Sequence, residues 1–521
     1  MNKAKITLSH LNLKDLEIIL RDGKYGFEKE ALRIKDLTIS ESNHPKSLGS
    51  KLFNKFITTD FAESQLELIT PPLEDAFYAI ELLDSINHYI QKNIIHETFW
   101  PFSIPPPIAS EEKIRIASFG SSNIGVFKHL YRKGLAKRYG KMMQSISGFH
   151  FNYSLPKQLW QILESREESS LRDSRNIRSE GYFRMLRNVT RMNWLVLYLF
   201  GASPVITKNF ISSNNESFSR LDKETYYLPY ATSLRMSDLG YQNLSRNTFQ
   251  ISKNSLGDYV SDLKMATSSK NQDFSKIDFS NPEISHRDQI NPNFLQIEDE
   301  YYAIARPKSE NTSNERSINK LLQGGVDFME LRSLDLNPFS RVGIDIETVL
   351  FLEVFLIYCF FESDDLITKD EIKIISENDL SVSRNGRDPK IILKENDCEL
   401  SLKSWGSKIL EEMTPIAEML NKNDSRYTDA ITKMSMKLKD PELTLSGKIL
   451  QKIKSHSGGF RGLGQEIAEN NKKYYLDIKK SHNLNWTILE KESSESLKQQ
   501  RLLEKNQEID FDSFLRDYFN D

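Results

Sequence analysis

The chain has few cysteines: only Cys359 and Cys398 occur among its 521 residues. Two cysteines are too few for a disulfide-built scaffold and lack the spacing of zinc ligands. Long hydrophobic runs are also missing, because the most apolar stretches, 194–199 and 350–361, fall short of the ~20 residues that cross a bilayer. These absences predict a cytoplasmic protein of a reducing compartment, with no membrane partner.

Charge of one sign is not in excess, since 70 Lys and Arg residues face 73 Asp and Glu residues, for a net charge of −3. This balance gives no overall field for nucleic acid or an anionic membrane, so we expect neither as a partner. A phosphate-binding glycine motif is missing as well. The segment 458–464 is rich in glycine but lacks the Lys-Ser/Thr pair of such a motif, and we predict that it forms a turn.

Four strand-like segments place acidic or metal-binding side chains at every second position. These segments are residues 26–32, 59–67, 148–153 and 326–332. Successive residues of a strand point to opposite faces of a sheet. The side chains that share a face are therefore Glu28 with Glu30, His150 with Asn152, and Glu330 with Arg332. The opposite face is mainly apolar, with Lys29 and Asp327 as polar exceptions.

A sheet face lined with carboxylates is costly unless cations lie on it. Oxygen ligands with one imidazole suit hard divalent ions, Mg²⁺ or Mn²⁺. The segment 59–67 is less regular, because Asp60 and Glu67 differ in parity and need a bulge or turn between them. Glu63 and Gln65 share the phase of Glu67 and are weaker candidates. For any single segment, an amphipathic surface strand is the alternative.

A carboxylate-rich cation site with arginines nearby is typical of phosphoryl transfer, in which metal ions and Arg neutralise the moving group. Helical periodicity predicts helices over residues 75–92, 123–139 and 181–200, and a mostly helical chain after Pro338. The stretches 212–219, 267–285 and 308–317 contain few large apolar residues and are predicted to be loops.

The last segment, from residue 490 onward, is predicted to be a solvated helix. The apolar side chains expected to pack it are Leu497, Leu502, Ile509, Phe511, Phe514 and Tyr518. No internal repeat or linker is visible, so we expect one catalytic domain over residues 1–521. Within it, residues 15–345 would form a sheet-containing core and residues 346–521 a mainly helical part packed on that core.

Five longer motifs resemble one family. They are residues 25–33, 57–63, 145–156, 226–241 and 330–338. In this order they resemble the glutamate–cysteine ligases of the gammaproteobacterial type. The resemblance implies an α+β, glutamine-synthetase-like fold: a curved, mostly antiparallel sheet that forms a funnel, with helices on its outer face. It also implies that ATP drives the ligation of the γ-carboxylate of L-glutamate to the amine of L-cysteine through γ-glutamyl phosphate, the first step of glutathione synthesis.

The same resemblance implies roles for individual residues. Those implied to hold Mg²⁺ are Glu28, Glu30, Asp60, Glu67, His150 and Glu330. Arg332, beside Glu330, would stabilise the transferred phosphoryl group, and Arg235 and Asn152 would hold the polar ends of the substrate. The other residues implied to bind substrate are Phe61, Tyr131, Leu135, Gln144, Ile146, Tyr241 and Tyr302.

Alternatives stay open at this point. The aromatic and aliphatic members of the substrate set are also what a hydrophobic core contains, and Arg235 also fits a surface ion pair. A ligase of the same fold with a different amine acceptor, a non-catalytic nucleotide or glutamate sensor, and a metal-dependent phosphohydrolase are the rival functions. We expect glutamate, cysteine and ATP as the small-molecule partners and a monomeric protein.

Overall fold

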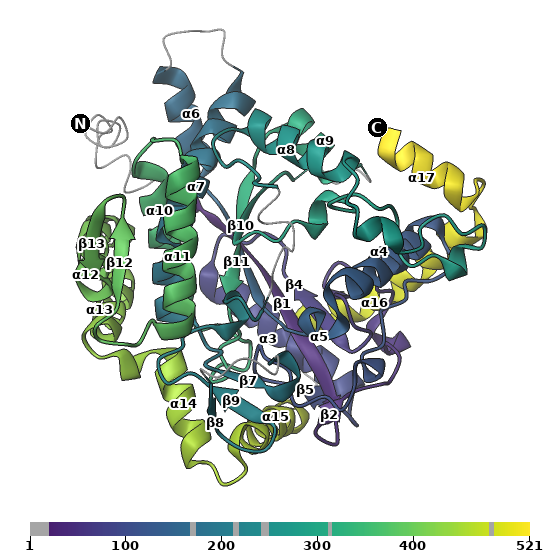
Figure 1. Cartoon of the computed structure of the whole chain (residues 1–521), viewed down its shortest axis with the longest axis horizontal. Coiled ribbons are helices and arrows are strands. Elements are labelled where there is room, and N and C mark those ends of the chain that lie inside the picture. The colour runs from purple at the N-terminus through teal and green to yellow at the C-terminus, as the bar shows by residue number, and fades with distance from the viewer. Residues whose placement is uncertain are drawn as a thin grey trace.

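An antiparallel sheet of eight strands runs through the molecule and is surrounded by helices (Figure 1). The structure is a computed structural model that describes residues 20–166, 173–211, 218–240, 249–310, 315–421, 423–478 and 484–520. Six strands follow the order β10-β11-β6-β1-β4-β3, and β2 and β5 both pair with β1. These strands are β1 (Lys24–Lys35), β2 (Thr38–Ile39), β3 (Ile57–Thr59), β4 (Gln65–Ile69), β5 (Thr98–Phe99), β6 (Phe149–Ser154), β10 (Ala305–Lys308) and β11 (Phe328–Leu334).

Helices make up most of the remaining described chain. They are α3 (Ala76–Asn93), α4 (Asn123–Tyr139), α5 (Lys141–Gln144), α6 (Lys157–Arg166), α7 (Ser174–Phe200), α8 (Leu256–Ser268), α9 (Ser317–Gly324), α10 (Ile346–Phe361), α11 (Lys369–Asn385), α12 (Leu402–Leu420), α13 (Arg426–Lys439), α14 (Leu445–Ser455), α15 (Gly459–Asp477), α16 (Leu484–Lys505) and α17 (Phe511–Asn520). Two small sheets are formed by β7 (Val205–Thr207), β8 (Ser219–Arg220) and β9 (Thr225–Tyr227), and by β12 (Ile392–Glu395) and β13 (Cys398–Ser401).

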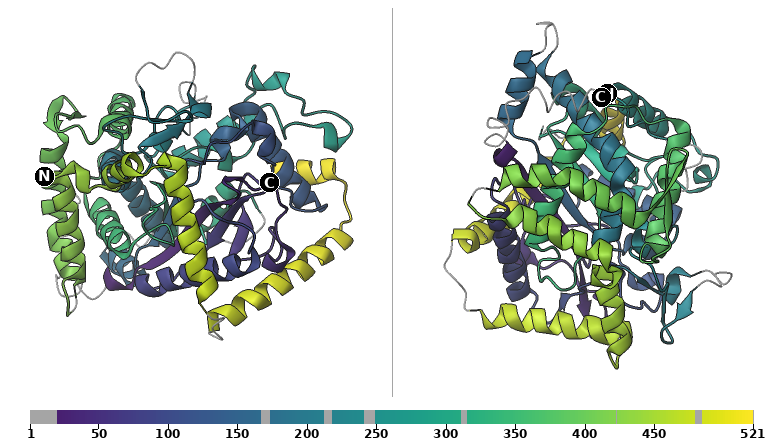
Figure 2. Two further views of the ribbon diagram at one scale, coloured as in Figure 1. Left: turned by 90° about the horizontal axis from the view of Figure 1, so that it is seen from below. Right: turned by 90° about the vertical axis from the view of Figure 1, so that its left-hand side faces the viewer.

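The apolar face of the large sheet packs on α3, α7 and α10. Its aromatic side chains Phe27, Phe149 and Phe151 are fully buried there. Helix α10 is apolar on every side, which is the pattern of a helix buried in a core rather than lying on a surface. Figure 2 (left) shows the purple strands between the green helices on one side and the yellow carboxy-terminal helices on the other. Within the described chain, no helix combines the length and the apolar character needed to cross a membrane.

The two polar exceptions on the apolar face both have polar partners. Lys29 is buried and its Nζ donates to Asn87 Oδ1 and to the Arg341 carbonyl, each at 3.0 Å. Burial lowers the pKa of Lys29 to about 7. Asp327 forms an ion pair with Arg178 at 3.0 Å. A polar residue can therefore occupy this face when it finds a fixed partner.

The helices predicted over 75–92 and 123–139 are confirmed as α3 and α4. The prediction for 181–200 was too short, because α7 begins at Ser174. Its first turns are polar: Arg175 bonds to Asp173 at the helix start and Arg178 pairs with Asp327. An apolar periodicity cannot mark turns that are fixed by ion pairs.

Two other predictions were wrong in part. The glycine-rich segment is mostly helical, since α15 begins at Gly459, and a Cβ on Gly464 would lie 2.1 Å from the Trp100 ring. Its glycines thus permit close helix packing rather than a turn. The carboxy-terminal segment forms two helices, α16 and α17, and the side chains of Leu502 and Ile509 are 59% and 45% exposed instead of packed.

Candidate active site

The register of the strands brings the predicted polar side chains onto one face. Three cross-strand pairs lie directly opposite each other: Glu28 with His150, Glu30 with Glu67, and Glu330 with Asn152. Side chains that face each other across neighbouring strands project from the same side of a sheet. The face predicted from the alternation within single segments is therefore continuous over β4, β1, β6 and β11.

His150 lies at the centre of this carboxylate face. Its Nδ1 is 3.1 Å from Glu28 Oε2 and 3.7 Å from Glu330 Oε1, and its Nε2 is 3.4 Å from Glu30 Oε1. Possible ligand atoms of Glu28, Glu67 and His150 lie within 4.8 Å of one another, as a shared metal ion requires. The chain thus gathers imidazole and carboxylate donors around one point.

Asp60 joins the carboxylate face from the turn between β3 and β4. This turn interrupts the strand alternation between Asp60 and Glu67, as the sequence predicted. Burial and then the charge of Asp60 raise the pKa of Glu30 to about 7. Burial and then the charge of Glu28, followed by that of Asp60, raise the pKa of Glu67 well above its ordinary value. Such mutual repulsion is relieved when a cation binds among the carboxylates.

Three buried oxygens on the face accept no hydrogen bond from any described residue: Gln65 Oε1, Asn152 Oδ1 and Glu330 Oε2. A buried acceptor without a partner is costly and calls for a metal ion, a ligand or water. The amide nitrogen of Asn152 donates to Glu28 Oε1 at 2.9 Å, so the amide oxygen is the end of this side chain that can accept from a ligand or bind a metal ion. The donor set of carboxylates, one amide oxygen and one imidazole fits a hard divalent cation.

The other end of the same face is cationic. Arg332 Nη1 lies 3.0 Å from Glu330 Oε1, and Lys308 Nζ lies 3.6 Å from Glu330 Oε2. Arg306 lies directly opposite Glu330 in the pairing of β10 with β11. Burial alone would raise the pKa of Glu330, but the charges of Lys308 and Arg332 outweigh it and hold that pKa well below its ordinary value. Glu330 therefore stands at the boundary between the two ends.

Sequence reasoning missed Arg306 and Lys308. The signal was present, because these cations alternate as the carboxylates do in the other segments. Pro307 between them disfavours a strand, and the loop predicted from residue 308 onward begins at the last residue of β10. Strand β10 lies at the edge of the sheet, where a proline removes no ladder hydrogen bond. Residues 311–314 of that predicted loop lie outside the described chain.

Helix α4 contributes a second pair of cations that was not predicted. Arg132 Nε donates to the Asp60 carbonyl, and its guanidinium lies 4.5 Å from the centre of the Phe119 ring. Burial, and then the charge of Arg132, lowers the pKa of Lys128 to about 8. Lys128 and Arg132 are four residues apart and so lie on one side of the helix, near Glu67.

Most of the predicted substrate residues lie in apolar surroundings beside this face. Phe61 and Ile146 are buried in one cluster, against which Leu135 and Tyr302 pack. Gln144, at the end of α5, is also buried. Tyr131 packs against a separate cluster. Tyr241 lies outside the described residues.

Arg235 is not the surface ion pair that was left open as an alternative. It is 2% exposed, and its Nε lies 2.7 Å from Asp335 Oδ1. Its Nη2 donates to the carbonyls of Leu334 and Arg332, at 2.6 and 3.1 Å. These bonds tie Arg235 to β11 and to the residue after it. Its role as a substrate ligand stays a prediction.

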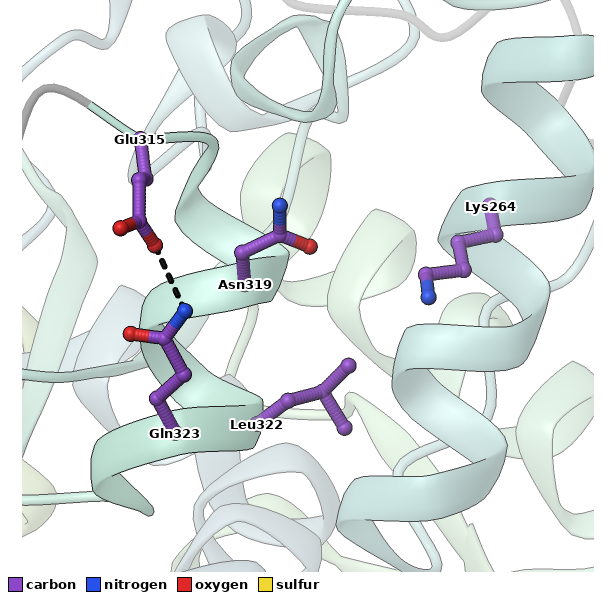
Figure 3. A pocket seen from close by; sticks show the side chains of 5 residues that line it. All are labelled: Lys264, Glu315, Asn319, Leu322 and Gln323. Atoms are coloured by element: carbon purple, nitrogen blue, oxygen red, sulfur yellow. Dashed lines mark hydrogen bonds between the residues drawn. The ribbon is translucent and has the colours of Figure 1, made fainter. Parts of the chain in front are cut away.

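A separate pocket of about 380 Å³ lies between α8 and α9 and is drawn in Figure 3. Lys264 of α8 faces Leu322 and Asn319 of α9 there, while Glu315 accepts a hydrogen bond from Gln323 at 2.8 Å. None of its lining residues belongs to the large sheet. The pocket is therefore distinct from the carboxylate face.

A family model described as glutamate–cysteine ligase matches residues 8–382. The chain belongs to the glutamate–cysteine ligase family. Two curated proteins of this name, from Pseudomonas fluorescens and Janthinobacterium sp., are each 37% identical to the chain. Each match covers 96% of the chain and 94% of the relative.

Solved structures agree with this glutamate–cysteine ligase assignment. The crystal structure of glutamate–cysteine ligase from Francisella tularensis in complex with AMP is 35% identical and has a TM-score of 0.89, covering 96% of the chain and 98% of that protein. A bifunctional glutathione synthetase from Pasteurella multocida, 24% identical with a TM-score of 0.73, covers 92% of the chain and 55% of that protein, and shows the fold alone.

The predicted family, the predicted α+β, glutamine-synthetase-like fold and the predicted ATP-dependent glutamate–cysteine ligase activity are thus confirmed for this chain. The division of the chain at residue 345 and the roles of the individual site residues stay predictions.

Proposed function

We propose that the chain ligates the γ-carboxylate of L-glutamate to the amine of L-cysteine, with cleavage of ATP to ADP and phosphate. The observation that carries this proposal is one sheet face divided into a carboxylate end around His150 and a cationic end around Arg332. A free carboxylate is a poor acyl donor because oxide is a very poor leaving group. Its attack on the γ-phosphorus of ATP gives γ-glutamyl phosphate, from which the amine of cysteine displaces phosphate.

ATP as co-substrate is supported by the AMP complex of the Francisella tularensis relative. The carboxylate end fits Mg²⁺, or Mn²⁺, through its crowded oxygens and its buried acceptors that receive no hydrogen bond. We propose that the metal ligands are Glu28, Glu30, Asp60, Glu67, His150 and Glu330. Such ions, when bound, neutralise phosphate charge and polarise the transferred phosphoryl group.

The cationic end would bind and orient the phosphoryl group. Glu330 holds the Arg332 guanidinium at 3.0 Å, which fixes its direction before any substrate binds. Lys308 Nζ, 3.6 Å from the other oxygen of Glu330, would contribute a second positive charge. In this proposal Asn152 and Arg235 hold the polar ends of the glutamate substrate.

We propose that the amine pocket lies beside this face, toward α4. Its members would be Phe61, Tyr131, Leu135, Gln144, Ile146 and Tyr302, together with Tyr241. Aromatic walls give a small thiol side chain apolar contact, and a thiol differs little from a methyl group in such surroundings. The two cysteines are free thiols, in keeping with the proposed cytoplasmic location, and we propose that the protein acts as a monomer.

The test is product formation by the full-length chain with ATP, glutamate and Mg²⁺, with and without cysteine. We expect ADP and phosphate release that depends on cysteine, and a product with the mass of γ-glutamylcysteine. 2-Aminobutyrate should serve as a poorer amine acceptor, by about 10- to 200-fold at most, as for a one-group difference in an apolar pocket. Phosphate release without any amide product would indicate a phosphohydrolase, and a strong preference for another amine would indicate a different acceptor.

A further inference from the structure

The carboxy-terminal residues 500–520, here called the C-terminal strap, comprise the end of α16, the connection that follows it and α17 (Figure 1). The strap first contacts the beginning of α4. Gln507 Oε1 accepts from the Asn123 backbone N at 2.6 Å, and Asn123 Nδ2 donates to the Ile509 carbonyl at 2.9 Å. Glu504 accepts from the Ser121 backbone N at 3.0 Å. Helix starts leave backbone N–H groups without intrahelical partners, and the strap supplies acceptors there.

The strap then covers the outer side of α4 with α17. The ring centre of Phe127 lies 4.7 Å from the ring centre of Tyr518 and 5.9 Å from that of Phe514. Tyr131 of α4 packs against the same apolar cluster, which also contains Phe511. This cluster is separate from the main core, so α17 supports α4 locally. The strap and Tyr131 thus pack on one shared apolar cluster.

The strap also reaches the segment that leads to Tyr302. Asp512 forms an ion pair with Arg287 through both carboxylate oxygens, at 2.5 and 3.0 Å. The guanidinium of Arg316 lies 5.4 Å from the ring centre of Phe519 and pairs with Glu298. Glu298 begins a short 3₁₀ helix (Glu298–Glu300) that ends just before Tyr301 and Tyr302.

Helix α4 and that short helix are locked together beneath the strap. Arg138 pairs with Glu300 at 2.8 Å, and both side chains are fully buried. Tyr139 OH donates to the same carboxylate at 2.8 Å, and Gln296 Nε2 donates to the Tyr131 carbonyl at 3.2 Å. The two elements that carry Tyr131 and Tyr302 therefore form one unit, with the strap on its outer side.

We propose that the C-terminal strap is the positioning element of the amine pocket, and that it sets the affinity for cysteine far more than the affinities for ATP and glutamate. This inference rests on the proposed function. The described contacts of α17 go to α4, to the segment 284–298 and to Arg316, whereas the carboxylate face is built on strands packed against the main core. Helix α4 also carries Lys128 and Arg132 close to the carboxylates, but the strands that bear those carboxylates are held by the main core. Loosening the strap therefore shifts Tyr131 and Tyr302 more than it shifts the phosphoryl-transfer face.

The test is the steady-state kinetics of a full-length variant that carries both Phe514→Ala and Tyr518→Ala. The KM for cysteine should rise about tenfold, as the loss of aromatic contacts of this kind implies, with kcat at saturating cysteine and the KM values for ATP and glutamate within about twofold. Tyr518→Phe keeps the ring and should behave as wild type. Asp517→Ala, at an exposed position of the same helix, is the matched control.

An unchanged KM for cysteine, or equal increases in all three KM values, overturns the proposal. Should the double variant not fold, Asp512→Asn tests it by removing the charge of a half-exposed side chain that pairs with Arg287. That variant should raise the KM for cysteine about threefold and leave the other two nearly unchanged, because a half-exposed ion pair contributes little energy. If the wild type makes no γ-glutamyl amide at all, the proposed function fails and the inference falls with it.

Discussion

Replacing Glu330 with Gln removes one negative charge from the boundary of the two ends while keeping the volume of the side chain. Glu330 is 1% exposed, so water cannot replace the missing charge. Its partners are Arg332 at 3.0 Å, Lys308 at 3.6 Å and His150 at 3.7 Å. The variant loses a proposed metal ligand and the group that directs Arg332 at the same time.

We expect Glu330→Gln to lower kcat by about 10²–10³, the loss typical of one preorganised electrostatic group in a site that excludes water. This factor corresponds to about 2.7–4 kcal/mol of transition-state stabilisation. The assay is ADP release with glutamate and cysteine at saturating Mg²⁺, with circular dichroism and thermal unfolding as checks of the fold.

Glu353→Gln is the matched control, since Glu353 is an equally buried carboxylate on α10, behind the opposite face of the sheet. It should leave kcat within a few-fold of wild type. Activity of Glu330→Gln within a few-fold of wild type would remove Glu330 from the proposed metal site and refute the reasoning from the divided face.

Three further predictions concern other residues. His150→Ala should raise the Mg²⁺ concentration needed for half-maximal activity by at least about tenfold, which is the loss expected when a metal ligand or the group that orients it is removed. An unchanged Mg²⁺ titration would show that His150 has a structural role. Tyr131→Ala should raise the KM for cysteine far more than those for ATP and glutamate; equal effects on all three would place Tyr131 in the general architecture. Burial raises the pKa of Glu353 to about 7, so the native state holds a proton that the unfolded state releases near pH 4.5, and stability falls as the pH rises through this window. The free energy of unfolding in urea should therefore rise by about 3 kcal/mol for Glu353→Gln relative to wild type between pH 4.5 and 8. If the two proteins show the same dependence of this free energy on pH, the raised pKa of Glu353 is contradicted.

The polar face could be predicted from the sequence because alternation within a strand fixes which side chains share a side. The neighbours of each strand could not, since β1 pairs with β6 across more than a hundred residues of intervening chain. Register is a tertiary property, and it alone placed Glu30 opposite Glu67. The same limitation hid Lys308, whose role is visible only once β10 is known to pair with β11.

Local rules were wrong where packing decided the outcome. Position 464 is glycine because Trp100 packs so close to α15 that a side chain would have no space, and nothing near position 464 in the sequence indicates this contact. Leu502 looked like a packing residue by its spacing, yet it is exposed, whereas Phe511 is buried against α4. The course of the C-terminal strap depends on such long-range contacts.

The central claim is that the γ-carboxylate of glutamate is phosphorylated on the divided face before the amine attacks. Glutamate labelled with ¹⁸O in its γ-carboxylate tests this most directly, by mass analysis of the phosphate released with ATP and cysteine in unlabelled water. Attack of the carboxylate on the γ-phosphorus transfers one carboxylate oxygen to phosphate, so the account predicts one ¹⁸O atom in each phosphate formed with amide product. Phosphate that carries no label while γ-glutamylcysteine accumulates would contradict it.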